Sequence, residues 1–279
     1  MSTGHPPVVT FLSDFGLDGA AAICHGVMLS LCPDAQIVDI AHTVPKYSIA
    51  DGAFILASAL PFMPVGVHLA IVDPGVGTQR RPIALQAGRG DLLVGPDNGL
   101  LVAGADALGG VVEARELANP ELWGPTVSST FHGRDVFAPV AARLAARTAQ
   151  LAEVGPVLEA AELVQPPVRR ALVRDGWLET EVIYVDSFGN LRLAGSEADL
   201  VQLVGRNRRP LGLAIELPDA AAGMQVLEST FVATFGDVED GAPLVYVDSG
   251  GHLALADNRG NAAARLGATT GTRIRIRAR

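Results

Sequence analysis

The sequence predicts an α/β N-terminal domain with a largely parallel sheet, followed by an all-β, barrel-like C-terminal domain. In the first half, near-continuous apolar strands alternate with helical stretches, a pattern typical of a parallel sheet covered on both faces. After Glu162 the pattern changes to short alternating runs punctuated by Gly, Asp and Asn, which favours a barrel or sandwich. We predict an α/β domain at residues 1–164, a linker at 165–176 and a β-barrel-like domain at 177–279.

The first domain begins with an apolar strand that ends at Asp14 and an Ala-rich helix that Pro33 closes. Behind Pro45, apolar residues recur with helical spacing from Ser48 to Leu60. The predicted elements, in order, are strand 7–14, helix 18–31, strand 35–44, helix 48–60, strand 65–73, strand 82–88, a strand, turn and short helix within 91–109, and a long Ala-rich helix at 135–151.

The linker is indicated by two prolines and the absence of a long apolar period in LVQPPVRRALVRDGWLE. The strands predicted beyond it lie within 178–190, 211–219, 229–238, 243–256 and 271–279. The last of these contains TRIRIRAR, a strict alternation and the clearest strand of the set.

The bulk properties narrow the possible partners. The chain has 279 residues and a net charge of −9, which argues against nucleic acid or an anionic membrane as a partner and favours a small-molecule substrate. No apolar run reaches the roughly 18 residues of a membrane span, and the first residues do not read as a signal peptide. Cys24 and Cys32 lie outside any CxxC motif, so we expect reduced core cysteines and a cytoplasmic protein.

Polar residues fall where a strand-end site would place them, because open α/β sheets bind ligands beyond the carboxyl ends of their strands. Each also has an ordinary structural interpretation, since turn aspartates cap helices and stabilise tight turns. His132 precedes the long predicted helix as a cap or a catalytic group, and its neighbours Arg134 and Asp135 are expected to pair locally or cap that helix. The strand-end candidates are Asp14, Tyr47, Asp73, Pro96–Asn98, Asp186–Asn190, Ser249 and Asn258–Asn261.

Two other sites are not supported by motif spacing. The turn GVGT at 75–78 lacks the spacing of a phosphate-binding loop. The remaining histidines share no ligand spacing such as HExxH, so we predict no metal site and no cofactor; they are His5, His25, His42, His68 and His252.

Five ordered motifs resemble those of the S-adenosylmethionine hydrolases, also called S-adenosylmethionine hydroxide adenosyltransferases, which are related to fluorinase and chlorinase. The motifs are TFLSDFG, VDPGVGTQRRPIAL, GPDNGLL, STFHGRDVFAP and DSFGN. The resemblance covers nearly the whole chain. It implies the same two domains and a homotrimer, whose nucleoside site lies between the N-domain of one subunit and the C-domain of its neighbour.

The resemblance also implies a catalytic triad of Asp73, Arg80 and His132 around an attacking water. The substrate would be S-adenosylmethionine, whose sulfonium leaves as neutral methionine and needs no general acid. The protein would align the water opposite the departing sulfur and favour its deprotonation. Arg81 is left out of this triad, because beside Pro82 it is expected to cap the turn or face solvent.

For substrate binding, the resemblance assigns Asp14 to the ribose diol and Tyr47 to the nucleoside wall, with Asn98 in the matching strand-end turn. From the second domain it assigns Asp186 to the ammonium group of the methionine part and Ser249 to its carboxylate. It assigns Phe188 and Asn190 to the adenine.

Water is favoured over a halide as the nucleophile. An ionised Asp73 would repel fluoride or chloride by about 1 to 4 kcal/mol at about 4 Å, and the chain lacks the extra loop of fluorinases before strand 82–88. DSFGN is also one residue shorter than the corresponding fluorinase stretch. The alternatives are a 5′-halogenating enzyme, a non-catalytic sensor of S-adenosylmethionine or adenosine, and a metal-dependent hydrolase with Asp14, Asp73 and His132 as ligands.

Overall fold

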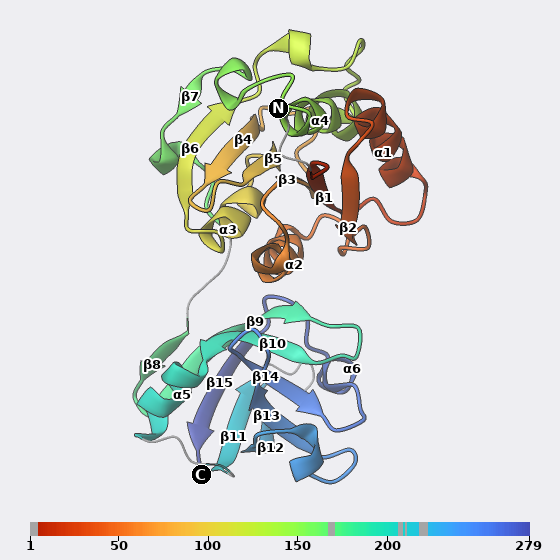
Figure 1. The fold of residues 1–279 in the computed structure, drawn as a ribbon. Helices are drawn as coiled ribbons and strands as arrows, with labels where there is room; N and C mark the ends of the chain where they lie inside the picture. The colour runs from red at the N-terminus through yellow and green to blue at the C-terminus, as the bar shows by residue number, and fades with distance from the viewer. Residues whose placement is uncertain (1–4, 167–170, 206–208, 210, 218–222) are drawn as a thin grey trace. The chain divides into compact units, whose positions relative to one another are not determined.

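A computed structural model of the chain describes residues 5–166, 171–205, 209, 211–217 and 223–279. The chain divides into two compact units, residues 1–167 and 168–279 (Figure 1). Of the predicted linker at 165–176, residues 167–170 lie outside the described residues, and Leu172–Arg174 form strand β8. Residues 218 and 219, the end of one predicted strand, also lie outside them.

The first unit is built on a mixed sheet with strand order β2-β1-β3-β5-β4-β6-β7. Its strands are β1 (Val8–Ser13), β2 (Gln36–Ala41), β3 (Val67–Ile71), β4 (Pro82–Ala87), β5 (Leu92–Pro96), β6 (Val111–Glu116) and β7 (Val157–Leu158). The four strands β2, β1, β3 and β5 are parallel, which confirms the α/β fold predicted with a parallel core. Strand β4 is antiparallel to β5 and β6 because only a tight turn joins it to β5, which is too short for a crossover connection.

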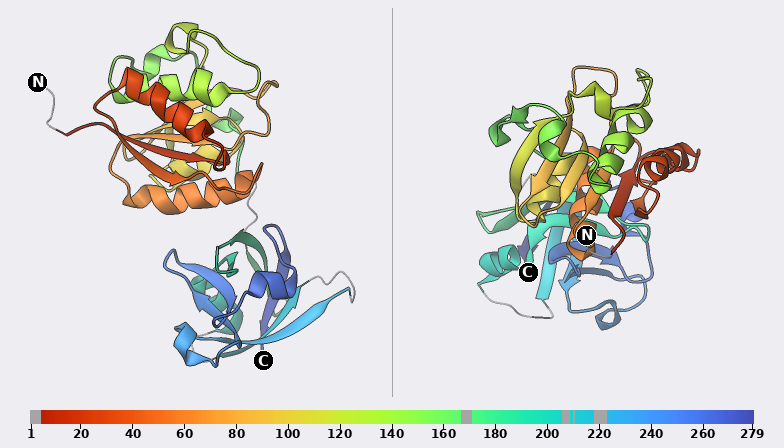
Figure 2. Two further views of the ribbon diagram at one scale, coloured as in Figure 1. Left: turned by 90° about the vertical axis from the view of Figure 1, so that its right-hand side faces the viewer. Right: turned by 45° about the horizontal axis from the view of Figure 1, so that its top comes forward.

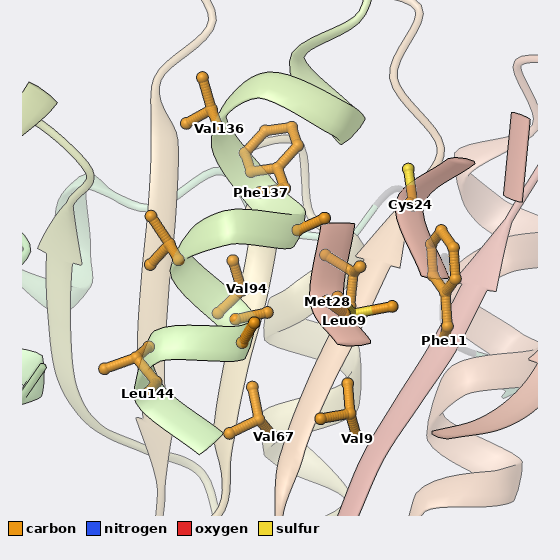
Figure 3. Packing of buried hydrophobic residues seen from close by; sticks show 14 of the residues in the cluster. Val9, Phe11, Cys24, Met28, Val67, Leu69, Val94, Val136, Phe137 and Leu144 are labelled. Carbon is orange, nitrogen blue, oxygen red and sulfur yellow. The ribbon is translucent and has the colours of Figure 1, made fainter. Parts of the chain in front are cut away.

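Helices cover both faces of this sheet, as Figure 2 shows, so its central strands are buried on both sides. Helices α1 (Ala20–Leu31) and α4 (Ala138–Ala145) pack on one face, and α2 (Ile49–Ala59) and α3 (Leu100–Asp106) pack on the other. Figure 3 shows the first of these layers, where Phe11 of β1 lies among side chains such as Met28 of α1 and Phe137. Single helical turns complete the unit: η1 (Leu60–Phe62), η2 (Pro120–Leu122), η3 (Gly133–Phe137), η4 (Leu151–Glu153) and η5 (Ala160–Glu162).

The two cysteines belong to this apolar layer. Cys24 and Cys32 are buried and free, and burial raises the pKa of the Cys24 thiol to about 12. Such a thiol stays protonated at neutral pH, so Cys24 fills space in the core rather than acting as a nucleophile.

The prediction of one long helix at 135–151 is wrong at both ends, because the helical segment runs from Gly133 to Ala145. Its first turn, η3, is a π-helix, and α4 ends at Ala145. The helix stops because Arg147 adopts a left-handed conformation with φ of 58°, and the N–H groups of Thr148 and Ala149 both donate to the carbonyl oxygen of Arg143. The run of alanines gave no signal for this termination.

A buried polar relay lies near the amino ends of β3 and β5. The side chains of Thr10, His68 and Asp91 are completely buried. Thr10 Oγ1 lies 2.9 Å from His68 Nδ1, and His68 Nε2 lies 2.8 Å from Asp91 Oδ1. Arg89 donates two further hydrogen bonds to the same carboxylate, so every polar group of this relay has a partner.

The second unit is a seven-stranded barrel with strand order β10-β14-β13-β12-β11-β15-β9, closed by the pairing of β9 with β10. Strand β8 extends it beside β9. The bounds are β8 (Leu172–Arg174), β9 (Trp177–Val185), β10 (Leu191–Ser196), β11 (Leu211–Leu217), β12 (Gln225–Phe231), β13 (Pro243–Val247), β14 (His252–Asp257) and β15 (Arg273–Ala278). The predicted barrel-like fold is therefore confirmed, although β12 starts earlier and ends earlier than the predicted strand 229–238.

Buried apolar residues alternate with outward-facing polar residues along the barrel strands. In β15, Ile274 and Ile276 are buried, whereas Arg275 and Arg277 lie over the ring of Trp177 at 4.3 and 4.8 Å. This follows from the period of two in a strand. Among the described residues of this unit, three helical segments accompany the barrel: α5 (Glu197–Val204), η6 (Phe235–Asp237) and α6 (Ala262–Leu266). No helix within the described residues has the length and apolar character needed to cross a membrane.

Candidate active site

The first part of the candidate site lies at the carboxyl ends of β1 and β3. These parallel strands pair with Ser13 opposite Ile71, and the N–H of Asp14 donates to the carbonyl oxygen of Ile71 at 3.3 Å. Asp73 follows two residues after Ile71. The pairing register therefore brings the segments that carry the two aspartates to the same edge of the sheet, where ligands of open α/β sheets bind.

Asp73 and Arg80 form a nearly buried ion pair. Arg80 Nε donates to Asp73 Oδ1 at 3.0 Å, and Arg80 Nη2 donates to Asp73 Oδ2, so the contact is bidentate. The two side chains expose only 6% and 8% of their surface. The Arg80 guanidinium also lies over the Phe137 ring at 5.2 Å. Such a pair fixes the plane of the carboxylate, and Arg80 Nη1 is buried without a hydrogen-bond partner among the described residues.

The turn between Asp73 and Arg80 depends on Gly77. Thr78 Oγ1 donates to the carbonyl oxygen of Gly75 at 2.7 Å, and the N–H of Arg80 donates to the same hydroxyl at 3.3 Å. Gly77 has φ of 76°, and a Cβ there would lie 2.5 Å from the carbonyl oxygen of Ser129. The backbone therefore folds tightly enough to return Arg80 to Asp73.

His132 completes this cluster. Its Nδ1 lies 3.4 Å from Arg80 Nη2, a long contact in which the guanidinium must be the donor. Burial, and next the positive charge of Arg80, lower the pKa of His132 from its ordinary value of 6.5. The imidazole is therefore neutral at pH 7, with the Nδ1 lone pair directed towards the ion pair.

The π-helical turn η3 positions His132. His132 stands immediately before η3, and Gly133 within it packs closely enough that a Cβ would lie 2.9 Å from the Phe15 ring. The rings of Phe15 and Phe131 contact each other edge-to-face at 5.7 Å. Single π turns in proteins often occur at functional sites, and here the turn connects the His132 segment to the end of β1. As expected, Arg134 pairs with its neighbour Asp135, through bonds of 2.6 and 3.0 Å.

Asp14 and Tyr47 are joined by a backbone contact. The N–H of Tyr47 donates to Asp14 Oδ2 at 2.9 Å. Tyr47 has φ of 67°, an uncommon conformation for a residue of this size, and the residue is 69% exposed. The strand-end aspartate thus holds the tyrosine in a strained backbone conformation that presents an exposed ring beside the site.

Asn98 and Arg81 have supporting positions. Asn98 Nδ2 donates to the carbonyl oxygen of Val72 at 2.8 Å, and its Oδ1 accepts the N–H of Leu100 at 3.2 Å. The expectation that Arg81 caps the turn or faces solvent is wrong. Arg81 donates to the buried carboxylate of Asp97 at 2.6 and 3.0 Å and to the carbonyl oxygen of Glu162 at 2.6 Å. Sequence reasoning left Asp97 unpaired because this contact joins distant segments.

The DSFGN segment forms a tight turn in the barrel unit. Asp186 Oδ1 accepts the N–H groups of Phe188 and Asn190 at 2.9 and 3.0 Å, and Oδ2 accepts Asn190 Nδ2 at 2.9 Å. The Phe188 side chain is 75% exposed. Gly189 has φ of 83° and packs against the side chain of Asn261, which places the Asn258–Asn261 segment beside this turn. The aspartate therefore shapes a turn that displays an aromatic ring.

Ser249 lies in a second turn of the same design. Asp248 Oδ1 accepts the N–H groups of Gly250 and His252 at 2.8 and 2.9 Å. Arg192 Nη1 donates to Asp248 Oδ2, and Arg192 Nη2 lies 4.0 Å from Asp186 Oδ2. Arg192 therefore bridges the turn that carries Phe188 and the turn that carries Ser249.

Sequence reasoning missed Arg192 and Asp248. A signal was present for Asp248, because the tetrapeptide YVDS occurs twice, at 184–187 and at 246–249. In both copies a strand ends at Val, and the Asp side chain accepts N–H groups two and four residues further on. The sequence offered no comparable signal for Arg192, since the bridge depends on how β10 lies between the two turns.

Fold and site together define a two-unit protein of the α/β-plus-barrel class, with a charged cluster at the strand ends of the first unit and paired polar turns in the second. Residues 9–155 match the family model for the N-terminal domain of SAM (S-adenosylmethionine) hydroxide adenosyltransferases, and residues 180–275 match the model for its C-terminal domain. The chain belongs to the SAM hydroxide adenosyltransferase family.

Named relatives agree with this membership. An (R)-S-adenosyl-L-methionine hydrolase of Salinispora tropica is 49% identical over 273 residues, which cover 98% of each chain. A fluorinase of Nocardia brasiliensis is 31% identical, covering 99% of this chain and 98% of its own. A crystal structure of an uncharacterized conserved protein from Thermotoga maritima has a TM-score of 0.86 at 33% identity, covering 96% of this chain and 99% of that one.

Proposed function

We propose that the chain hydrolyses (R)-S-adenosyl-L-methionine to adenosine and L-methionine. The observation that carries this proposal is the nearly buried Asp73–Arg80 pair with His132 beside it, in a chain that is 49% identical to an (R)-S-adenosyl-L-methionine hydrolase. The oxygen of a water attacks C5′ of the substrate, and the C5′–S bond breaks. Methionine leaves as a neutral thioether, and one proton is released.

Asp73 and Arg80 orient the water. The bidentate contact holds the carboxylate of Asp73 in one plane, so that its free lone pairs accept hydrogen bonds from a water in one direction. Holding the reacting atoms in this way is the kind of contribution that is worth several kcal/mol in well-oriented systems.

His132 accepts the proton. Its pKa is lowered by burial and by Arg80, so at neutral pH the imidazole is unprotonated. Its Nδ1 accepts only the long 3.4 Å contact from Arg80 Nη2, and this contact must be given up for Nδ1 to take the proton. No group is needed to protonate the leaving sulfur.

Substrate contacts are proposed from both units. Asp14 binds the ribose diol and the exposed ring of Tyr47 packs on the nucleoside, supported by the contact between them. In the barrel unit the exposed ring of Phe188 stacks on adenine, with Asn190 beside it, and Asp186 and Ser249 address the methionine end. Asn98 supports the end of β3 through its bond to Val72. We further propose that these units meet across the subunits of a homotrimer.

The test compares adjacent arginines. Wild type, Arg80→Lys and Arg81→Lys are incubated with S-adenosylmethionine, with and without chloride and a chelator, and the products are separated by chromatography. Wild type is expected to give equal amounts of adenosine and methionine from the (R) epimer, unaffected by either additive. Arg80→Lys should lower kcat by about 100-fold, because lysine cannot make the bidentate contact that holds Asp73.

Arg81→Lys is the matched control. It should retain the wild-type kcat and lower the melting temperature, since Arg81 anchors the buried Asp97 rather than the site. A 5′-chloro product would instead indicate a halogenating enzyme. Tight binding without turnover in wild type would indicate a sensor, and equal kcat in all three proteins would contradict the role given to Arg80.

A further inference from the structure

A second cluster of chemically active side chains lies on the first unit and has no part in the proposed reaction. His25 comes from α1, Asp39 from β2 and His42 from the segment just after β2. His25 Nε2 lies 2.8 Å and His42 Nε2 3.0 Å from Asp39 Oδ1, and one ligand atom from each residue lies within 4.8 Å of the others. Across the described ranges, this is the one group of three such side chains with ligand atoms so close together.

Hydrogen bonding alone does not satisfy this cluster. Both imidazoles approach the same carboxylate oxygen, and His25 makes the hydrogen bond. His42 Nε2 is buried and makes no hydrogen bond to any described residue, although it lies within ion-pair distance of Asp39. A buried ring nitrogen directed at a carboxylate and a second imidazole is the arrangement that a metal ion would complete.

The imidazole rings are held in place. Phe11 contacts His42 edge-to-face at 4.7 Å and His25 at 5.7 Å, and the two imidazole rings lie 5.9 Å apart. His42 Nδ1 is 2.8 Å from Ser13 Oγ, and the His42 carbonyl oxygen accepts the N–H of Gly16 at 2.7 Å. When Nδ1 donates to the hydroxyl, the lone pair of Nε2 is free to bind a metal, which is the usual role of such an outer hydrogen bond.

We propose that His25, Asp39 and His42 form a binding site for a divalent transition-metal ion of the zinc type. Two imidazole nitrogens and one carboxylate oxygen suit zinc, whereas Mg²⁺ and Ca²⁺ prefer oxygen ligands. Ligand atoms around a tetrahedral zinc lie roughly 3.3 Å apart, so the contacts of 2.8 and 3.0 Å need to open only slightly. Asp39 is 44% exposed, which gives the ion an entry path and leaves room for a water ligand.

The site was not predicted from the sequence because its ligands follow no metal-binding motif. His25 and Asp39 come from different elements, and only the packing of α1 against the edge of the sheet brings them together. It is also separate from the triad. Its nearest connection to the candidate active site is the Ser13–Asp14 strand end, through the bonds that His42 makes to Ser13 and Gly16.

The test is direct metal binding by the full chain without a histidine tag. The protein is stripped with a chelator, titrated with Zn²⁺ by calorimetry and assayed for metal after gel filtration. Wild type should bind about one equivalent, and His25→Ala and Asp39→Asn should each weaken binding at least tenfold. His5→Ala removes an exposed histidine outside the cluster and should bind as wild type does.

A second readout separates loss of the site from loss of the fold. Saturating Zn²⁺ should raise the melting temperature of wild type and of His5→Ala, because a ligand that binds only the native state stabilises it. It should leave the melting temperature of folded His25→Ala and Asp39→Asn unchanged. Substoichiometric binding by wild type, or equal affinity in wild type and both cluster variants, would overturn the proposal.

Discussion

Two neighbouring residues, Arg80 and Arg81, have different roles because they face different partners. Arg80 turns back to Asp73, whereas Arg81, just before β4, reaches Asp97, just after β5. The choice of Arg80 as the partner of Asp73 followed from a motif and not from spacing alone. The role of Arg81 could not be predicted, since its partner Asp97 directly follows β5, whose antiparallel pairing with β4 was not apparent in the sequence.

The pH dependence of turnover tests the role given to His132. Burial and the charge of Arg80 lower its pKa from 6.5, so the neutral form persists at pH 7 and is lost only on further acidification. We expect kcat/KM, which reports the pKa of the substrate-free protein, to be flat above neutrality and to fall on the acidic side with a midpoint below 6.5. Stopped assays across this range in wild type and His132→Gln provide the measurement.

Two results would speak against this role. His132→Gln should have low activity without the acidic limb, so a variant that keeps the limb would assign it to another group. A midpoint at or above the ordinary histidine value would show that burial and Arg80 together do not lower the pKa of the catalytic base.

Among the elements, the turn from Asp73 to Arg80 is the one that most directly builds the site. Gly77→Ala should destabilise the protein by about 1 to 3 kcal/mol, because it forces a side chain into a left-handed conformation. It would also place the new Cβ against the carbonyl oxygen of Ser129. Since this turn carries Arg80, we expect kcat to fall as well. Denaturant titration and steady-state kinetics measure the two effects.

Gly90→Ala is the matched control for this turn. Gly90 also has a positive φ, of 100°, but a Cβ there would have nothing within 4 Å. Its substitution should therefore cost stability through backbone strain alone and leave kcat unchanged. Equal effects of both substitutions on kcat would mean that the close approach to Ser129 does not position Arg80.

Elements with a strong local pattern were predicted, and those set by distant contacts were not. The alternation in TRIRIRAR identified β15, and continuous apolar runs identified β1 and β3. Helix α5 was missed despite a local signal, the capping box in which Ser196 and Asp199 bond to each other's backbone N–H groups. The π turn η3 was not predicted. Its Gly133 packs against Phe15, a contact between distant residues that local helix propensity does not indicate.

At the scale of the whole molecule, the proposed substrate contacts are divided between two units, and this division can be tested by mixing variants. Asp73→Asn removes the charge at the water site, and Phe188→Ala removes the exposed ring of the barrel unit. If each site combines units of two subunits in a trimer, co-expression of the two weakly active variants should restore about a quarter of the wild-type sites. Activity of the purified mixed oligomer measures this restoration.

The homogeneous variants provide the reference for this experiment. Each should be weakly active when expressed alone, and the gain should appear only in co-expressed protein. A site formed within one chain predicts no gain on mixing, because every chain then carries one damaged unit. That outcome would overturn the shared site and leave the hydrolase proposal intact.

The buried side chains of Thr10, His68 and Asp91 show why a row of catalytic residue types need not be a catalytic site. A hydroxyl, an imidazole and a carboxylate follow one another at 2.9 and 2.8 Å as in a hydrolase's nucleophilic triad, but the ring nitrogens are exchanged, because Nδ1 faces the hydroxyl and Nε2 faces the carboxylate. Yet all three side chains are wholly buried, and burial lowers the pKa of His68. These three side chains therefore support the fold without reaching a ligand. Asp73 and Arg80 are also nearly buried, but they lie at the carboxyl edge of the sheet, where a ligand can approach. In this fold, position at that edge separates the reactive side chains from the structural ones.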